Sequence, residues 1–423
     1  MTVEPAPSLS PPSQVPPVVP TPGPAQRLTQ EPTPGPANVR PRYGEASLAD
    51  VMPSVLAVLG VPGASDTLDL RAAGLAGVRT VVVLLLDGFG YHQLALAAPH
   101  TPTIADIVRS DGAAAGTAVR AITTVFPSTT PTSLASLGTG APPGAHGVMG
   151  FFVNIPGTDL VLNHVQWRDD PNPLRWQPLP TQFDRARAAG VESYEVSQPE
   201  FASSGLTVAA FRGAEYVGGT GPDGVADGVL NLVARATGPT IVFGYLADVD
   251  KAGHIWGLDS PQWRMAVAGA DRLVTRLVEA LPADAALVVT ADHGQIDVPV
   301  DGRFDLADHP SLRAGVRVVA GEPRVRYLHT LDGARDDVLA TWRGVLGETA
   351  WVVSREEAAA DGWFGPIPEA HLRRVGDVVV VCHENHLVLA SGIDPDQVAK
   401  NIAFHGSATA PEMTVPLLIV RAA

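Results

Sequence analysis

Three short apolar stretches of the sequence each lead into acidic or histidine residues. These residues are Asp87 after 80–86, Asp250 and His254 after 240–245, and Asp292 and His293 after 285–290. A further histidine, His405, stands close to the last residues. Carboxylate oxygens and imidazole nitrogens at strand ends form the ligand set of zinc-type ions. Each signal is weak alone, but its repetition predicts a metal site.

A fourth stretch, residues 126–147, offers a hydroxyl group. Pro131 suits the start of a helix, so Thr130 is expected as the N-cap, with the free amides of the first turn beside its side chain. The helix is expected to run through 132–137 and to stop at Gly138 and Gly140. A helix N-terminus of this kind attracts phosphate, although the same pattern also describes an ordinary helix cap.

Together these residues suit phosphoryl transfer. Two divalent ions about 4 Å apart can clamp the attacking and leaving oxygens of an in-line displacement. A threonine hydroxyl is a poor nucleophile at neutral pH and needs metal coordination, which is a reason for Thr130 to lie among ligands. Asp250 and His254 are four residues apart, so one helical turn would let them share an ion; they also suit a solvated helix start.

The stretches that carry these residues fit strands buried on both faces. Continuous apolar runs are typical of parallel sheets covered by helices, whose ligands lie at the carboxyl ends of the strands. The predicted fold class is therefore α/β, with a mainly parallel sheet sandwiched between helices. Further strands are expected at 117–125, 192–196, 207–211 and 415–420, and helices at 48–60, 224–236 and 261–281.

Composition divides the chain into a tail and a folded part. Residues 1–45 are rich in proline and are expected to form a disordered tail, and residues 46–423 to form the folded domain. Within that domain, residues 150–180 are expected to be a loop-rich cover. Residues 300–400 mix strands with a helix at 334–346, which predicts a smaller α+β insertion or second lobe.

The charge balance narrows the class of partner. The 423 residues carry a formal net charge of −15 and contain lysine only at Lys251 and Lys400, so no polymeric nucleic acid is expected as a partner. An anionic substrate would have its charge met locally, by metal ions. The sequence shows no apolar run of about 18 to 20 residues and no secretory signal, which predicts no membrane contact and a cytoplasmic location by default.

The order of these motifs resembles the alkaline phosphatase superfamily. The set comprises DGFG at 87–90, the threonine loop ending in LGTG, DxxxH with GH, DHG at 292–294, and a late HG followed by PEMTVPL. Within the superfamily, the chain most resembles the type I phosphodiesterase/nucleotide pyrophosphatase family, over about residues 78–420. The resemblance implies that family's fold, a mainly parallel sheet between helices, and its two Zn²⁺ ions.

The resemblance also implies a role for each motif residue. Thr130 would be the nucleophile and would form a phosphothreonine intermediate. The ion that activates the nucleophile would be held by Asp87, Thr130, Asp292 and His293. The ion that supports the leaving group, and later the water, would be held by Asp250, His254 and His405. The expected substrate is a small phosphate ester, such as a nucleotide.

The nucleophile loop departs from the family pattern in two ways. Pro131-Thr132-Ser133 follows Thr130 where the family continues with Phe-Pro-Asn-His, so Thr129 and Ser128 stay open as alternative nucleophiles. The family also places an asparagine shortly after the first HG, where this chain has Phe151. Phe151 and Trp256 stand near motif positions and are weak candidates for substrate binding.

Three other functions remain open at this stage. The same metal pair could serve a phosphomonoesterase or a phosphonate hydrolase. From a different class, the chain could be a metal-binding homologue without catalysis. Sulfatases are disfavoured because no Cys or Ser stands in a C/S-x-P-x-R motif.

Overall fold

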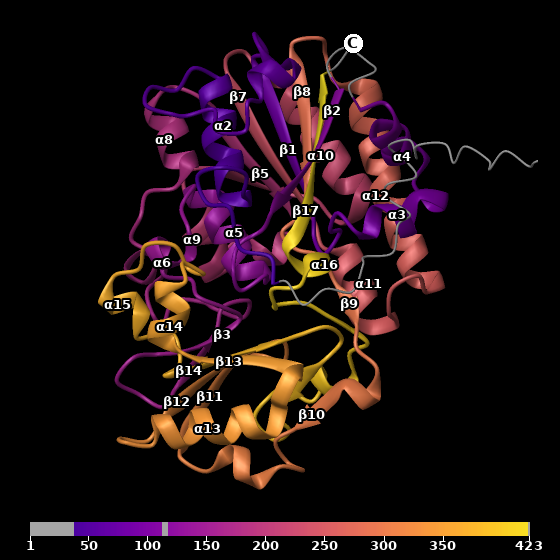
Figure 1. Ribbon diagram of the computed structural model, residues 1–423. Helices are drawn as coiled ribbons and strands as arrows, with labels where there is room; N and C mark the ends of the chain where they lie inside the picture. The colour runs from indigo at the N-terminus through magenta and orange to yellow at the C-terminus, as the bar shows by residue number, and fades with distance from the viewer. Residues whose placement is uncertain (1–37, 112–116, 422–423) are drawn as a thin grey trace, which may run out of the picture.

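The computed structural model describes residues 38–111 and 117–421 and has a seven-stranded sheet at its centre (Figure 1). Strand β17 runs antiparallel to both of its neighbours, and the other pairs of the sheet are parallel. This confirms the predicted fold class. In spatial order the strands are β2 (Thr117–Thr123), β17 (Thr414–Arg421), β8 (Ala285–Thr290), β1 (Thr80–Leu86), β7 (Thr240–Leu246), β5 (Glu192–Ser197) and β6 (Glu215–Gly218).

Helices cover both faces of this sheet, as Figure 1 shows. One face packs against α2 (Val51–Val58), α5 (Thr130–Thr139), α8 (Gln182–Ala188) and α9 (Gly205–Phe211). The other packs against α3 (Gln93–Ala97), α4 (Pro102–Arg109), α10 (Gly221–Arg235), α11 (Asp248–Trp256) and α12 (Pro261–Ala280). Because successive side chains of a strand point to opposite faces and both faces are covered, β1 is apolar from Val81 to Leu86. Its residues alternate between the two cores, with Val81, Val83 and Leu85 in one and Val82, Leu84 and Leu86 in the other.

A second, smaller sheet forms a lobe below the first in Figure 1. Its antiparallel strands are β11 (Val316–Glu322), β12 (Val325–Thr330), β14 (Val378–Cys382) and β13 (Ala350–Ser354). Helix α13 (Arg335–Leu346) packs on one face of this sheet. The other face shares a core with the cover segment and with α5. We call residues 316–382 the lobe.

Short elements complete the described chain. In the cover they are β3 (Phe152–Asn154), β4 (Val161–Asn163) and α7 (Pro173–Trp176). Elsewhere they are α6 (Pro143–His146), β9 (Ile296–Asp297), β10 (Arg303–Asp305), α14 (Arg355–Ala360), α15 (Glu369–Leu372), β15 (Leu387–Leu389), β16 (Ala403–Phe404) and α16 (Ala410–Met413). Of the expected tail, residues 1–37 lie outside the described residues. Residues 38–45 pack on the folded part, where Val39 N donates to the Ala408 carbonyl (2.7 Å) and the Tyr43 hydroxyl to the Trp363 carbonyl (2.9 Å).

One predicted element was wrong, and a predicted helix has different bounds. The strand expected at 207–211 is helix α9, whose buried residues Leu206, Ala209 and Ala210 recur with helical spacing and whose first turn is capped by Ser204. The N-cap of α5 is Thr129 rather than Thr130, and the helix continues past Gly138 to end at Gly140, which has a left-handed φ of 65°. Gly138 serves packing instead, because a Cβ there would lie 1.9 Å from the Ala210 carbonyl oxygen.

A buried acid on β5 should make the stability of the fold depend on pH. Glu195 is 4% exposed, and burial raises its pKa from 4.5 to about 8. Because the folded chain keeps a proton that the unfolded chain releases, wild-type stability should fall between these two pH values by up to about 1.4 kcal/mol per pH unit. The Glu195→Gln variant lacks this loss, so its stability relative to the wild type should grow with pH. Urea unfolding of both proteins on either side of this window measures the difference, and parallel pH profiles would contradict the prediction.

Candidate active site

The carboxyl ends of three adjacent strands bring the predicted residues to one edge of the sheet. Strands β7, β1 and β8 are neighbours in parallel register, with Leu86 opposite Leu246 and Leu85 opposite Thr290. The chain leaves these strands into the loops and helix that carry the acidic and histidine residues. The antiparallel β17 lies beside β8, so the residues that precede β17, including His405, also reach this edge.

A first group of possible ligand atoms comprises Asp87, Asp292 and His293. One ligand atom from each lies within 4.8 Å of the others. His293 Nε2 is 3.6 Å from Asp87 Oδ1 and 3.3 Å from Asp292 Oδ2. The Thr130 hydroxyl oxygen lies 3.2 Å from the same His293 Nε2. All four residues predicted for one ion therefore meet at one point.

A second group comprises Asp250, His293 and His405, again with ligand atoms within 4.8 Å of one another. Asp250 Oδ1 lies 3.4 Å from His254 Nε2 and 3.8 Å from His405 Nε2. His293 belongs to both groups, and its ring stacks on that of His405 with centroids 3.6 Å apart. The structure thus brings together all seven residues that sequence reasoning placed around the metal pair.

The donor set fits divalent cations. Asp87 Oδ1 and Asp292 Oδ2 are buried and have no hydrogen-bond partner. Burial and the nearby Asp292 and Asp250 carboxylates raise the pKa of Asp87 well above its usual range. Buried, mutually repelling carboxylates with free oxygens are stabilised when a cation lies between them. Oxygen and imidazole nitrogen atoms together suit zinc or a similar ion.

The three histidines present the same ring nitrogen to the site. The Nδ1 atoms of His254, His293 and His405 donate to the carbonyls of Ala403 (2.8 Å), Gly294 (3.2 Å) and Ser128 (3.0 Å). Because a neutral imidazole has one N–H, these bonds leave each Nε2 unprotonated, so its lone pair can accept a hydrogen bond, as His293 Nε2 does from the Thr130 hydroxyl, or bind a cation. Burial, with the neighbouring His293 and His254 rings, also lowers the pKa of His405 well below its usual range, which favours the neutral form.

Two residues that sequence reasoning missed hold the carboxylates. The Tyr245 hydroxyl donates to Asp87 Oδ2, which leaves Oδ1 free for a ligand. Gln295 Nε2 donates to Asp250 Oδ1 at 2.6 Å. Gln295 has room because Gly253 lacks a side chain; a Cβ there would lie 2.0 Å from Gln295 Oε1. No sequence signal singled out either residue, since both read as ordinary members of a buried strand or its end.

The Tyr245→Phe variant should weaken metal binding without disturbing the sheet. It removes one hydroxyl and lets the Asp87 carboxylate rotate, and the loss of such an outer partner typically costs about 10- to 100-fold in metal affinity. Titration with a zinc-selective dye measures the change. Tyr194→Phe is the matched control, because the Tyr194 hydroxyl lies on the exposed side of β5. Equal affinities for the two variants would contradict the role of Tyr245.

The geometry distinguishes Thr130 from its two alternatives. The Ser128 hydroxyl donates to the Ser407 carbonyl at 2.6 Å, and that bond directs it to the loop after His405. Thr129 is fully buried as the N-cap of α5. Of these three hydroxyls, only that of Thr130 forms a hydrogen bond with a residue of the two metal-ligand groups, His293.

The two weak substrate-binding candidates lie outside these groups. Phe151 precedes β3, and its ring packs against Phe152 with centroids 4.9 Å apart. Trp256 ends α11, two residues after His254, and is 52% exposed. Their role in substrate binding stays a prediction.

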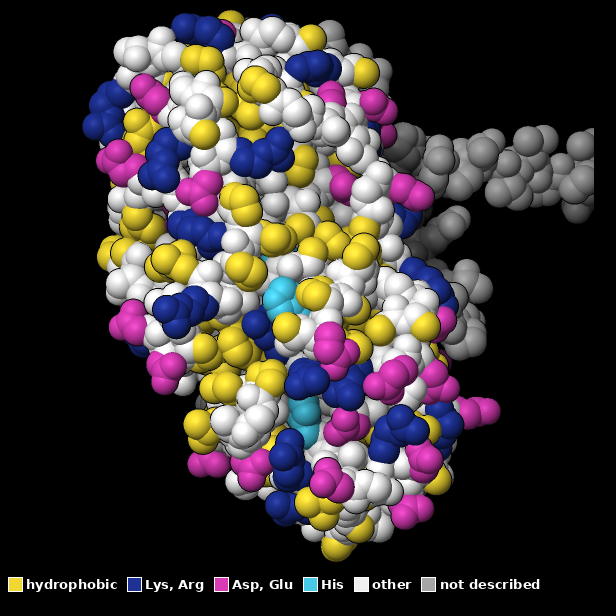
Figure 2. Space-filling view, turned by 90° about the vertical axis from the view of Figure 1, so that its left-hand side faces the viewer, with side chains coloured by type: hydrophobic (Ala, Val, Ile, Leu, Met, Phe, Trp, Pro, Cys, Tyr) yellow, Lys and Arg dark blue, Asp and Glu magenta, His cyan; other side chains and the backbone are white. Residues whose placement is uncertain are grey.

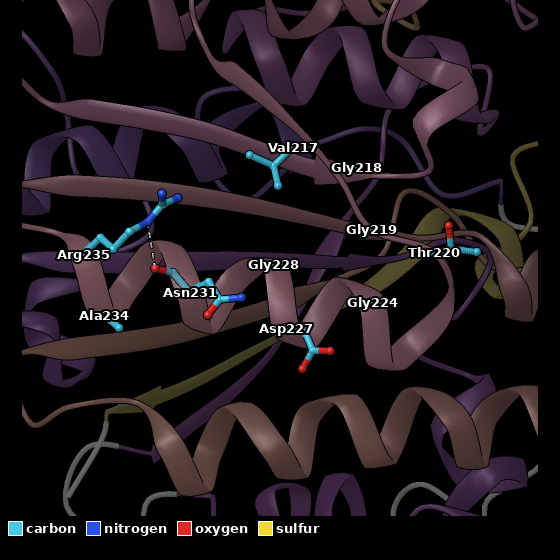
Figure 3. A pocket seen from close by; sticks show the side chains of 10 residues that line it. All are labelled: Val217, Gly218, Gly219, Thr220, Gly224, Asp227, Gly228, Asn231, Ala234 and Arg235. Atoms are coloured by element: carbon cyan, nitrogen blue, oxygen red, sulfur yellow. Dashed lines mark hydrogen bonds between the residues drawn. The ribbon is translucent and has the colours of Figure 1, made fainter.

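A separate surface groove of about 710 Å³ lies between the edge strand β6 and α10 (Figure 3). Its glycines serve close packing, because a Cβ at Gly228 would lie 2.6 Å from Val196 and one at Gly219 2.8 Å from the Gly224 carbonyl oxygen. The Arg235 side chain bonds back to the Asn231 carbonyl of its own helix. None of the predicted site residues lines the groove, which therefore does not belong to the candidate site.

Two observations concern the surface charge and the helices. On the face drawn in Figure 2, basic and acidic side chains are interspersed rather than gathered into one basic field. Each helix within residues 38–111 and 117–421 is too short or too polar to be a membrane span.

Comparisons with known proteins give the family and the fold of the chain. The family model described as "Type I phosphodiesterase / nucleotide pyrophosphatase" matches residues 81–408. Comparison with curated proteins gives no match. Murine ectonucleotide pyrophosphatase / phosphodiesterase 5 has a similar structure, with a TM-score of 0.63 and 21% identity, over 80% of this chain and 87% of its own.

Two further solved structures share the fold. Phosphonoacetate hydrolase from Sinorhizobium meliloti has a TM-score of 0.62 at 21% identity and covers 82% of this chain and 91% of its own. Human ectonucleotide pyrophosphatase / phosphodiesterase 5 has a TM-score of 0.60 at 16% identity and covers 80% of this chain and 87% of its own. The match of the family model over most of the chain shows that this protein belongs to the type I phosphodiesterase / nucleotide pyrophosphatase family of phosphoric ester hydrolases, within the alkaline phosphatase superfamily.

Proposed function

We propose that the protein is a phosphodiesterase of the nucleotide pyrophosphatase type that acts through a phosphothreonine intermediate. The observation that carries this proposal is the position of Thr130. Its hydroxyl lies 3.2 Å from His293 Nε2, and His293 is the residue common to the two groups of ligand atoms. A nucleophile placed there can attack a phosphorus atom held between the two groups.

The residues predicted for the metal pair would hold two divalent cations, with Zn²⁺ the expected ion. Asp87, Thr130, Asp292 and His293 would hold one, and Asp250, His254 and His405 the other. When bound, these cations supply the positive charge that lowers the pKa of a coordinated hydroxyl and offsets the charge of the phosphoryl oxygens. Tyr245 and Gln295 keep the carboxylates oriented toward that charge.

The reaction is a double displacement. Thr130 Oγ1 attacks phosphorus as its hydroxyl proton passes to water, the bond to the leaving oxygen breaks, and the leaving alcohol or nucleotide takes a proton back from water. Water then attacks the phosphothreonine from the vacated side and releases Thr130. Two in-line displacements give overall retention of configuration at phosphorus. Helix α5 would assist, because Thr130 lies in its first turn and the positive end of the helix dipole would then lie near the phosphoryl group.

The family relatives suggest the substrate class. An inactive form of murine ectonucleotide pyrophosphatase / phosphodiesterase 5 was solved in complex with AMP, and the Sinorhizobium meliloti enzyme with phosphonoacetate. A small phosphate ester or nucleotide is therefore the proposed ligand. The missing amide of Pro131 and the phenylalanine at 151 remove two expected donors to the phosphoryl oxygens. This departure favours a phosphomonoesterase or phosphonate hydrolase as the second candidate.

A substrate panel tests the proposal. With zinc present, we expect hydrolysis of bis(p-nitrophenyl) phosphate and of p-nitrophenyl-TMP to exceed that of p-nitrophenyl phosphate, as followed by p-nitrophenolate absorbance. Preferential release from the monoester, or phosphate release from phosphonoacetate, would replace the diesterase by the second candidate. No turnover on any of these compounds with metal bound would instead identify a metal-binding homologue without catalysis.

A further inference from the structure

A hairpin of the lobe reaches the catalytic edge of the main sheet. Strand β11 ends at Glu322 and β12 begins at Val325, and these two residues pair across the turn. The turn is therefore Pro323-Arg324. Arg324 is 0% exposed although it carries a full charge, so its environment must compensate for the loss of hydration.

The compensation comes from Glu412, which precedes β17. Arg324 Nε lies 2.9 Å from Glu412 Oε1 and Arg324 Nη2 lies 2.7 Å from Oε2, a two-point contact between fully buried side chains. Arg324 Nη1 also donates to the His386 carbonyl. Such bidentate pairs are strong and fix geometry, and the loss of one partner leaves a buried charge unpaired.

Glu412 also accepts two hydrogen bonds from the loop that begins at His405. Its Oε1 accepts the Ser407 amide at 3.1 Å, and its Oε2 accepts the Thr409 hydroxyl. The loop 405–412 is thereby tied to the carboxylate that Arg324 holds.

The same loop is bonded to the segment before the nucleophile. Ser128 N donates to the Gly406 carbonyl at 3.1 Å, the Ser128 hydroxyl to the Ser407 carbonyl at 2.6 Å, and His405 Nδ1 to the Ser128 carbonyl at 3.0 Å. Ser128 is two residues from Thr130. One small network therefore sets the positions of a predicted metal ligand and of the predicted nucleophile.

The hairpin also contacts this network through Glu322. A Cβ at Gly406 would lie 2.8 Å from Glu322 Cδ, so the carboxyl group rests directly on the glycine backbone. Gly406 has a φ of +124°, which only glycine adopts readily. The residue after His405 is thus confined by Glu322 on one side and by the Glu412 network on the other.

We propose that the Arg324–Glu412 pair positions the metal site: through this pair the lobe holds His405, and with it Thr130, in place beside the two groups of ligand atoms. The proposal rests on the proposed function for the roles of His405 and Thr130. Neither Arg324 nor Glu412 is a catalytic residue in this scheme, because both act through the 405–412 loop.

A second buried pair on the same hairpin provides a matched control. Arg326 makes a two-point contact with Asp394 and donates from Nε to the Val388 carbonyl at 2.9 Å. Arg326 is 1% exposed, so its pair is buried like that of Arg324. Its partners lie in 388–394, not in the 405–412 loop. Substitution of Arg326 therefore removes a comparable buried ion pair from the same hairpin. It leaves the hydrogen bonds of the 405–412 loop in place.

The test compares zinc affinity and stability in Arg324→Lys and Arg326→Lys. Lysine keeps the charge but loses the two-point contact. Equilibrium dialysis should show that Arg324→Lys binds one of its two zinc ions, the one that His405 would hold, about 10- to 100-fold less tightly, while Arg326→Lys matches the wild type. Excess zinc should restore kcat of Arg324→Lys on the best ester of the panel. Thermal unfolding should show a comparable loss of Tm in both variants.

Other outcomes would overturn the proposal. Equal zinc affinities in the two variants would mean that the Arg324–Glu412 pair stabilises the lobe but does not position His405. If Arg324→Lys does not fold, Glu412→Gln measures the same affinity, and wild-type zinc binding in that variant also refutes the proposal. The dialysis does not depend on turnover, so inactivity of the wild type on every ester would contradict the proposed function and leave this test standing.

Discussion

The Thr130→Ala variant should lose turnover on phosphate esters by about 10³-fold or more while keeping nearly all of its metal. The methyl group of alanine cannot form the phosphothreonine, and the remaining water attack has only positioning and charge stabilisation to help it. Six protein ligands stay in place, and Asp87, Asp292 and His293 still meet within 4.8 Å. Metal analysis beside steady-state kinetics separates loss of the nucleophile from loss of the site.

Three control variants sharpen this result. Thr130→Ser keeps a hydroxyl on the first turn of α5 and should retain measurable turnover. Thr129→Val and Ser128→Ala should keep a phosphorylated intermediate, since their hydroxyls are buried or bonded to the Ser407 carbonyl. Trapping the enzyme with labelled substrate in acid, followed by peptide mapping, locates the phosphate. Unchanged activity of Thr130→Ala, with label on residue 128 or 129, would move the nucleophile.

The central strands of the main sheet were predictable because each is a short, continuous apolar run in the sequence. The run at 80–86 is buried on both faces, so its residues from Val81 to Leu86 are all apolar, and the polar residue that follows marks the strand end. The same pattern located β7 and β8. Since parallel neighbours end at a common edge, three strand ends were enough to predict that Asp87, Asp250 and Asp292 meet.

The helix boundaries were less predictable, because tertiary contacts override local signals. Residues 207–211 carry Thr, Val and Phe, which favour strands, yet they form α9, where the capping Ser204 and the close contact of Ala210 with Gly138 of α5 decide the outcome. The start of α5 shifted by one residue because Pro131 fits the second helical position as well as the first.

The residues that hold the site's carboxylates and loops in place could not be predicted from the sequence. Tyr245, Gln295 and Arg324 have ordinary neighbours in sequence, and only the fold brings them to the carboxylates they bind. Arg324 lies 88 residues from Glu412 along the chain. Motifs identify residues that touch the reacting atoms, whereas their partners depend on strand order and on the placement of the lobe.

The His405→Ala variant should lose about one metal ion per chain, because it removes one of the three predicted ligands of the second ion. Its Nε2 is 3.8 Å from Asp250 Oδ1, and its ring stacks on His293. Turnover should fall by about 10²-fold or more, since half of the charge that offsets the phosphoryl oxygens leaves with the ion. Inductively coupled plasma analysis of the dialysed protein gives the stoichiometry.

A buried histidine outside the site is the control for this variant. His329 is 4% exposed on β12 of the lobe, and its Nε2 has no hydrogen-bond partner. His329→Ala should therefore keep both ions and most of the activity, even if the lobe becomes less stable. Retention of two ions in His405→Ala would remove His405 from the ligand set. Asp250 and His254 would then need another partner, and the bond between His405 Nδ1 and the Ser128 carbonyl would serve the nucleophile loop alone.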